Sequence, residues 1–172
     1  MADQAKITEL LDKAWEKRIK GEFKAATTMV KEAQRKCPET DYNTRGRIYH
    51  IYMQISHDQH NLQTALEFSL HSHEYYVLAN NQNKIAHSGR HMADLLVELK
   101  RYEEAEQQYI TAIHIYKTES GTHSGDLANA LRAYAILLEK MQRRDEAIEM
   151  WYETRLIYQA ANFKAGVNEA NK

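Results

Sequence analysis

The sequence has 172 residues, of which 23 are basic and 24 are acidic, so its formal net charge is −1. This balance argues against a general nucleic-acid binder, because nothing in it supplies a large positive field for a phosphate backbone. The longest fully apolar run, Ala133–Leu138, is far shorter than the roughly 20 residues that a membrane-spanning helix needs. The charged first residues do not resemble a signal peptide. One cysteine, Cys37, excludes an internal disulfide and a cysteine-based zinc site. We therefore expect a cytoplasmic protein without a cofactor.

Helical periodicity runs through the chain. Ala, Leu, Glu, Lys, Gln and Tyr recur at three- and four-residue spacing, whereas the alternation typical of strands is absent. Short breaks rich in Gly, Pro or Asn separate the periodic segments, among them Lys20–Glu22, Cys37–Thr40, Asn80–Asn83 and Glu119–Gly125. The pattern predicts eight helices, at residues 3–20, 22–36, 41–57, 61–79, 83–99, 102–118, 125–140 and 144–161.

These helices form pairs that repeat along the sequence. The second helix of each pair opens with a short signature: GEFKAA at 21–26, HNLQTA at 60–65, KRYEEA at 100–105 and QRRDEA at 142–147. Their closing alanines are 39, 40 and 42 residues apart. A plain antiparallel bundle also alternates small and large residues, but four signatures in nearly constant register favour a repeat.

The first unit carries the pattern Gly21-x-Phe23-x-x-Ala26-x3-Val30-x2-Ala33-x4-Pro38. This pattern resembles the tetratricopeptide repeat, and units of about 40–42 residues are similar to the extended repeats of kinesin light chains. Residues 101–140 are the closest part. Ser69, Ser72 and Thr154 depart from the family pattern. The resemblance implies an all-α fold, a right-handed α-solenoid of four antiparallel helix pairs with a short C-terminal cap.

On this basis the chain forms a single repeat domain over residues 1–161. Its units are expected at residues 3–38, 41–79, 83–118 and 125–161, followed by a capping segment at 162–172.

The first helix of each pair has a polar face opposite its core stripe. In the family these first helices line a concave groove that receives an extended peptide or a partner helix. The face also concentrates arginines and a tryptophan, which dominate binding energy at interfaces. An ordinary polar helix surface is the alternative interpretation. The predicted groove residues are Leu11, Trp15, Arg18, Arg47, His50, Gln54, His57, His87, Arg90, His91, Asp94, Asn129 and Arg132.

Motifs for catalysis are absent: the sequence has no GxxxxGK[ST], GxGxxG or CxxC pattern. We therefore predict no enzyme activity and no catalytic residues. His87 and His91 have the spacing of two zinc ligands on one helix, but the glutamate of an HExxH motif is missing, so no metal site is predicted. The groove positions also do not match the arginine, lysine and asparagine clamp of repeats that hold acidic chaperone tails.

The predicted function is that of a non-enzymatic protein–protein interaction module that binds an extended or helical peptide segment. A peptide-sensing regulatory protein and a self-assembling scaffold are the alternatives. The last pair ends with apolar residues that include Trp151 and Leu156, and Phe163 and Val167 share one helical face in the tail. We expect the tail to fold back as a partial ninth helix, and we expect a weak homodimer through the C-terminal end because part of the last pair stays uncovered.

Overall fold

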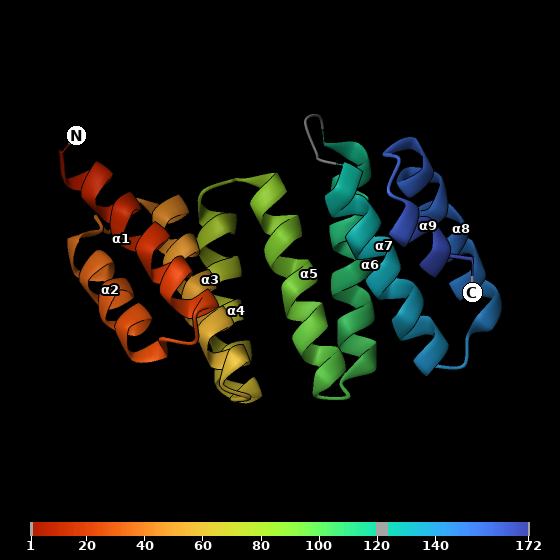
Figure 1. The fold of residues 1–172 in the computed structure, drawn as a ribbon, viewed down its shortest axis with the longest axis horizontal. Coiled ribbons are helices and arrows are strands. Elements are labelled where there is room, and N and C mark those ends of the chain that lie inside the picture. The colour runs from red at the N-terminus through yellow and green to blue at the C-terminus, as the bar shows by residue number, and fades with distance from the viewer. Residues whose placement is uncertain (1, 120–123, 172) are drawn as a thin grey trace. The chain divides into compact units, whose positions relative to one another are not determined.

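The computed structural model describes residues 2–119 and 124–171, and within them it contains only helices joined by short turns (Figure 1). The helices are α1 (Ala2–Ile19), α2 (Phe23–Lys36), α3 (Tyr42–Asp58), α4 (Leu62–Leu78), α5 (Gln82–Glu98), α6 (Tyr102–Thr118), α7 (Ser124–Lys140), α8 (Arg144–Ala160) and α9 (Lys164–Glu169). With 84% of the described residues helical, the structure has the all-α fold that the sequence predicts. All eight expected helices begin and end within one residue of the observed bounds. The expected break at Glu119–Gly125 lies mostly outside the described residues.

The chain divides into two compact units, residues 1–84 and 85–172. The first unit contains α1 to α4, and the second contains most of α5 together with α6 to α9. That residues 1–161 form one domain stays a prediction. Over the described residues, none of the helices combines the length and the apolar character that crossing a bilayer requires.

The turns that follow α3, α5 and α7 share one hydrogen-bonded geometry. His60, Lys100 and Gln142 adopt φ values of 60°, 60° and 62°, in the left-handed region. In each case the following residue donates its backbone N–H to a carbonyl five residues earlier, as Arg101 does to Leu96 at 2.8 Å. This is the closing bond of a Schellman motif, which satisfies carbonyls at the helix end. The bond compensates for a conformation that long side chains rarely adopt.

The core of the first unit is formed by the stripe Ile7, Leu11 and Ala14 of α1, packed on α2 and α3. Leu11 is only 1% exposed, so its assignment to a binding groove is wrong. Successive residues on a helix point about 100° apart. Because Ile7 and Ala14 are buried, the side of α1 that faces the core is the side on which Leu11 lies, and the adjacent Leu10 lies at its edge. Leu10, which the sequence pattern places in the core, is half-buried at the edge of this cluster.

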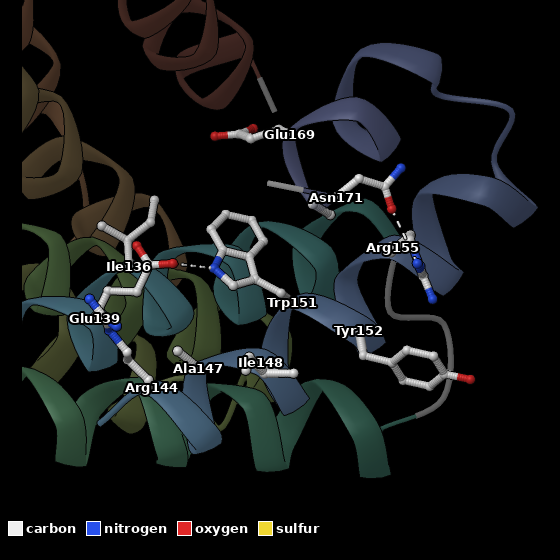
Figure 2. A pocket seen from close by; sticks show the side chains of 11 residues that line it. Ile136, Glu139, Arg144, Ala147, Ile148, Trp151, Tyr152, Arg155, Glu169 and Asn171 are labelled. Carbon is white, nitrogen blue, oxygen red and sulfur yellow. Dashed lines mark hydrogen bonds between the residues drawn. The ribbon is translucent and has the colours of Figure 1, made fainter. Parts of the chain in front are cut away.

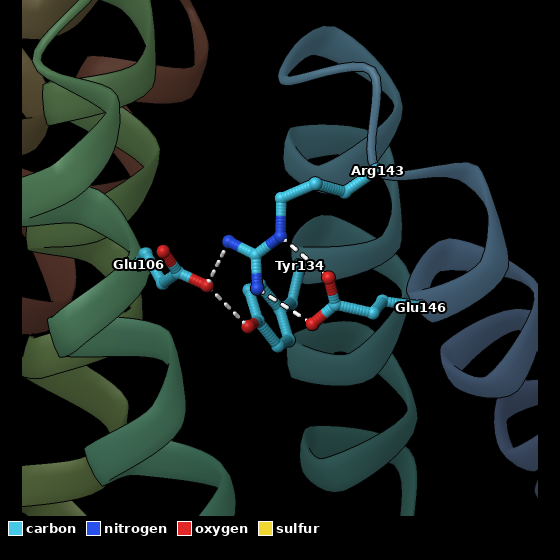
Figure 3. Close-up of polar contacts among 4 residues, drawn as sticks. All are labelled: Glu106, Tyr134, Arg143 and Glu146. Atoms are coloured by element: carbon cyan, nitrogen blue, oxygen red, sulfur yellow. Dashed lines mark hydrogen bonds and ion pairs between the residues drawn. The ribbon is translucent and has the colours of Figure 1, made fainter.

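In the second unit, one carboxylate connects α6 to the following pair. Glu106 on α6 accepts hydrogen bonds from the Tyr134 hydroxyl of α7 and from Arg143, both at 2.6 Å, and Figure 3 shows Arg143 bridging Glu106 and Glu146. Burial and the neighbouring Glu106 raise the pKa of Tyr134 above its ordinary value, so its hydroxyl stays a donor. The network therefore fixes α6 against α7 through a charge-assisted hydrogen bond.

Replacing Ala105 by leucine should destabilise the protein by roughly 1–3 kcal/mol, because overpacking a close helix crossing forces side chains off their preferred rotamers. Ala105 closes the third signature and has no exposed surface. Thermal or urea unfolding of Ala105→Leu measures the loss. Stability equal to the wild type would show that the residue does not lie at a tight crossing.

The tail folds back onto α8, as the sequence suggests. Gly166 is buried in α9, and a Cβ atom at this position would collide with the rings of Tyr158 and Phe163. Phe163 keeps half of its surface exposed while its ring edge packs on Tyr158 at 5.2 Å between centroids. The tail therefore packs on α8 through Gly166 as well as through Phe163.

Candidate functional site

In the first unit, the predicted groove residues of α1 and α3 gather around Trp15. The Trp15 ring stacks on the His50 ring at 6.2 Å with an interplanar angle of 16°. The Arg18 guanidinium lies 4.6 Å from the Trp15 ring centroid, within the range of a cation–π contact. Trp15, Arg18 and His50 are half-buried, so the indole is held between two side chains yet still reaches the surface.

Both arginines of this face have carboxylate partners. Arg18 donates two hydrogen bonds to Asp58, at 2.6 and 3.0 Å, and the two side chains are only 15% and 26% exposed. Arg47 pairs with Asp12 at a more exposed site, with 39% and 59% of the two side chains accessible. The face is therefore a set of neutral ion pairs around an aromatic centre, not a bare cationic surface.

Gln54 and His57 complete the α3 side of this face. They follow His50 by four and seven residues, which places all three on one side of the helix, and each is half-buried. The structure therefore brings together six of the predicted groove residues in the first unit. Asp12 and Asp58, which pair with the arginines, belong to the same surface.

In the second unit, Asp94 organises the predicted residues of α5. It accepts hydrogen bonds from Arg90 at 2.9 Å and from the Tyr109 hydroxyl of α6 at 2.6 Å. His91 contacts Arg90 at 2.9 Å, and the His87 and His91 rings pack edge to face with centroids 4.6 Å apart. Burial and the Asp94 charge raise the pKa of Tyr109, which keeps the phenol protonated as a donor.

On α7, Asn129 is exposed and Arg132 is already engaged. Arg132 donates to both oxygens of Glu169 on α9, one of them at 2.8 Å, and this contact raises the pKa of the guanidinium. The sequence pattern did not reveal this pairing, since Glu169 lies in the short tail 37 residues away. Arg132 therefore attaches the tail to α7.

A groove that the sequence did not predict lies at the C-terminal end of the second unit. It has a volume of about 880 Å³ and is bordered by α7, α8, the last residue of α9 and the residues that follow it (Figure 2). Ile136, Ile148, Trp151 and Tyr152 supply its apolar wall. The Trp151 indole N–H donates to Glu139 at 2.8 Å, so this ring is held in place. The sequence feature that could have indicated this groove is Ile148, an apolar residue in a charged part of α8.

Comparisons with known proteins agree with this architecture. Residues 84–160 match a family model described as tetratricopeptide repeat. No curated protein sequence matches the chain significantly.

Solved structures share the fold over nearly the whole chain. The apo form of RapI has a TM-score of 0.88 at 20% identity, and the match covers 99% of this chain but only 47% of RapI. BtubC (BKLC) from P. vanneervenii gives 0.69 at 14% identity, with 99% and 88% of the two chains covered. Tetratricopeptide-like repeats of a kinesin light chain from Podosopora anserina give 0.62 at 15% identity, with 99% and 93% covered. Residues 84–160 thus carry the sequence pattern of the tetratricopeptide repeat, and the described residues have the all-helical fold of these solved structures.

Proposed function

We propose that this chain is a non-enzymatic protein-interaction module that binds an extended or helical peptide segment on the faces of its first helices. Tetratricopeptide repeats are generally interaction scaffolds without catalytic activity. The observation that carries the proposal is the position of Trp15, held between Arg18 and His50 at the surface of the first unit.

A tryptophan in this setting is well suited to anchor a ligand. Tryptophan is enriched among the residues whose truncation costs the most binding energy. Because its ring already contacts both Arg18 and His50, little side-chain entropy is lost when a ligand packs on it. An apolar or aromatic side chain of the peptide would contact the exposed part of the indole.

The ion pairs define the chemistry around this anchor. Arg47 and Asp12 are the more exposed pair, and together they present a donor and an acceptor beside the indole. A peptide with polar groups of both signs fits this surface better than a purely acidic one. Arg18, Arg90 and Arg132 have the role of orienting their neighbours, because each is held by a carboxylate of this chain.

In the second unit we assign peptide contacts to the polar side chains that remain accessible beside the Asp94 network. His87, His91 and Asn129 are the residues of this group, and the histidines are half-buried. Imidazoles and an amide both donate and accept hydrogen bonds, which suits a peptide backbone.

The test is a selection of random 12-residue peptides displayed on phage against the immobilised protein. For the selected peptides, Trp15→Ala should weaken the affinity by about tenfold to thirtyfold, as expected for a buried anchor. Trp151→Ala is the matched control, since it removes the other tryptophan of the chain. This control should bind the peptides like the wild type.

Circular dichroism melts of both variants show whether the folds are retained. Selected peptides that bind Trp15→Ala and the wild type equally would refute the assignment of the first-unit face. Equal losses in both tryptophan variants would contradict it as well.

A further inference from the structure

Part of the face of α8 that borders the groove is covered in other helix pairs. The repeat units align on the alanines that close their signatures. In this alignment, Ile148 of α8 corresponds to Glu106 of α6, and Arg155 of α8 corresponds to Gln34 of α2. Gln34 contacts Tyr49 and Tyr52 of the next helix, and Glu106 accepts from Tyr134 of the next helix. These positions are therefore the ones against which a following helix packs.

On α8 the following helix is the short α9, which covers only part of this face. α9 packs near Tyr158, and Asn171 reaches Arg155 at 3.1 Å. Towards the N-terminus of α8 the covered position stays open, because Ile148 is 65% exposed. Tyr152 beside it is 54% exposed, much as Ile110 at the corresponding position of α6 is 43% exposed. Figure 2 shows both side chains at the border of the groove. Removing apolar side chains of this size from water is favourable, so covering this face stabilises a complex.

Charged residues flank this apolar centre with opposite signs. At about 100° per residue, Asp145 and Glu149 lie on one side of the line through Ile148 and Tyr152, whereas Arg144 and Arg155 lie on the other. Asp145, Glu149 and Arg144 are exposed. One helix thus carries an acidic flank, an apolar centre and a basic flank.

We propose that this face binds a second copy of the chain, with the two α8 helices side by side and parallel about a two-fold axis. In that arrangement the acidic flank of each helix meets the basic flank of the other, and Ile148 and Tyr152 of each copy cover the groove of the other. An antiparallel arrangement places acidic against acidic and basic against basic, which is unfavourable. The interface uses none of the residues assigned to peptide binding, so either proposal can fail without the other.

The exposed side of α1 complements this face less well. Helix α1 begins the first unit, and its exposed side carries Glu9 paired with Lys13. A head-to-tail contact would place Ile148 against this charged surface. Self-association through α8 is also what the sequence predicted as a weak homodimer through the C-terminal end.

Sedimentation equilibrium from about 10 μM to about 1 mM tests the proposal in the range of a weak complex. The wild type should shift from monomer to dimer across this range. Ile148→Asp should weaken association at least about tenfold, because it places a charge in the apolar centre. Ile110→Asp is the control: Ile110 is 43% exposed on α6, at the position that corresponds to Tyr152, and this change should leave association unaffected.

Charge reversal tests the orientation of the two copies. Glu149→Arg should weaken association at least about fivefold, and Glu149→Arg combined with Arg144→Glu should restore it to within about twofold. A wild type that stays monomeric near 1 mM overturns the proposal, and so does equal association of Ile148→Asp and the wild type. If Glu149→Arg strengthens association, the parallel arrangement is wrong.

Discussion

Raising the pH from about 10 to about 12 is expected to unfold the first unit. Its buried tyrosines ionise more readily in the unfolded chain than in the folded one, so a rising pH favours the unfolded chain. Burial raises the pKa of Tyr52 and Tyr76 to about 12, and the two residues are 8% and 4% exposed. In the unfolded chain their pKa lies near 10. The folded state therefore holds these protons more tightly, and the stabilisation is complete below about pH 10 and lost as the pH rises towards 12. A shift of two units is worth about 2.7 kcal/mol per tyrosine, which for two residues is comparable with the total stability of many domains.

Phenolate absorbance and far-ultraviolet circular dichroism, recorded along the same pH titration, measure the effect. We expect phenolate formation by the buried tyrosines and loss of helix signal to occur together. Tyr152 is 54% exposed, so Tyr152→Phe should leave the midpoint unchanged, whereas Tyr76→Phe should raise it. Full phenolate formation near pH 10 with an intact helix signal would contradict the prediction.

The positions of the helices could be predicted from the sequence because the 3.6-residue period is present in each helix and is lost at each turn. The turn geometry was less accessible: Asn80 in the left-handed region is a familiar helix stop, but Lys100 and Gln142 in the same region are not. Their conformation results from the hydrogen bond that closes the turn, which depends on the fold around it.

The candidate site could be predicted as a set of surface positions but not as a set of interactions. Helix periodicity alone places Trp15, Arg47 and His50 on exposed faces, and the structure has all three partly exposed. The period does not specify which residues pair between helices, so the contacts of Arg18 with Asp58 and of Arg132 with Glu169 could not be read from the sequence. The error at Leu11 has a similar origin, since adjacent leucines allow two stripes and only packing on α2 and α3 selects one.

Gly46→Val is expected to destabilise the first unit by about 3 kcal/mol, at the upper end of the usual cost of overpacking. Gly46 lies in α3, where an added Cβ atom would be 2.5 to 2.9 Å from three atoms of the Tyr76 ring. Tyr76 is only 4% exposed, so its ring is surrounded by other protein atoms. The Ser72 hydroxyl donates to the Gly46 carbonyl oxygen at 2.9 Å, which fixes the close approach of α3 and α4. Glycine at position 46 leaves the space that the tyrosine ring occupies. The aligned units have Ala33 and Ala112 where Ser72 stands, and the Ser72 hydroxyl makes a hydrogen bond that an alanine could not make.

Urea unfolding of three variants separates this clash from a general effect of replacing glycine in a helix. Gly125 has no neighbour within 4 Å of an added Cβ atom, so Gly125→Ala should change the stability by less than about 0.5 kcal/mol or increase it slightly. Gly46→Ala should cost about 1–3 kcal/mol in the wild-type background. The same change should cost clearly less in a Tyr76→Leu background, because the smaller side chain leaves space for the methyl group. Equal costs in both backgrounds would show that the tyrosine ring is not what excludes a side chain at position 46.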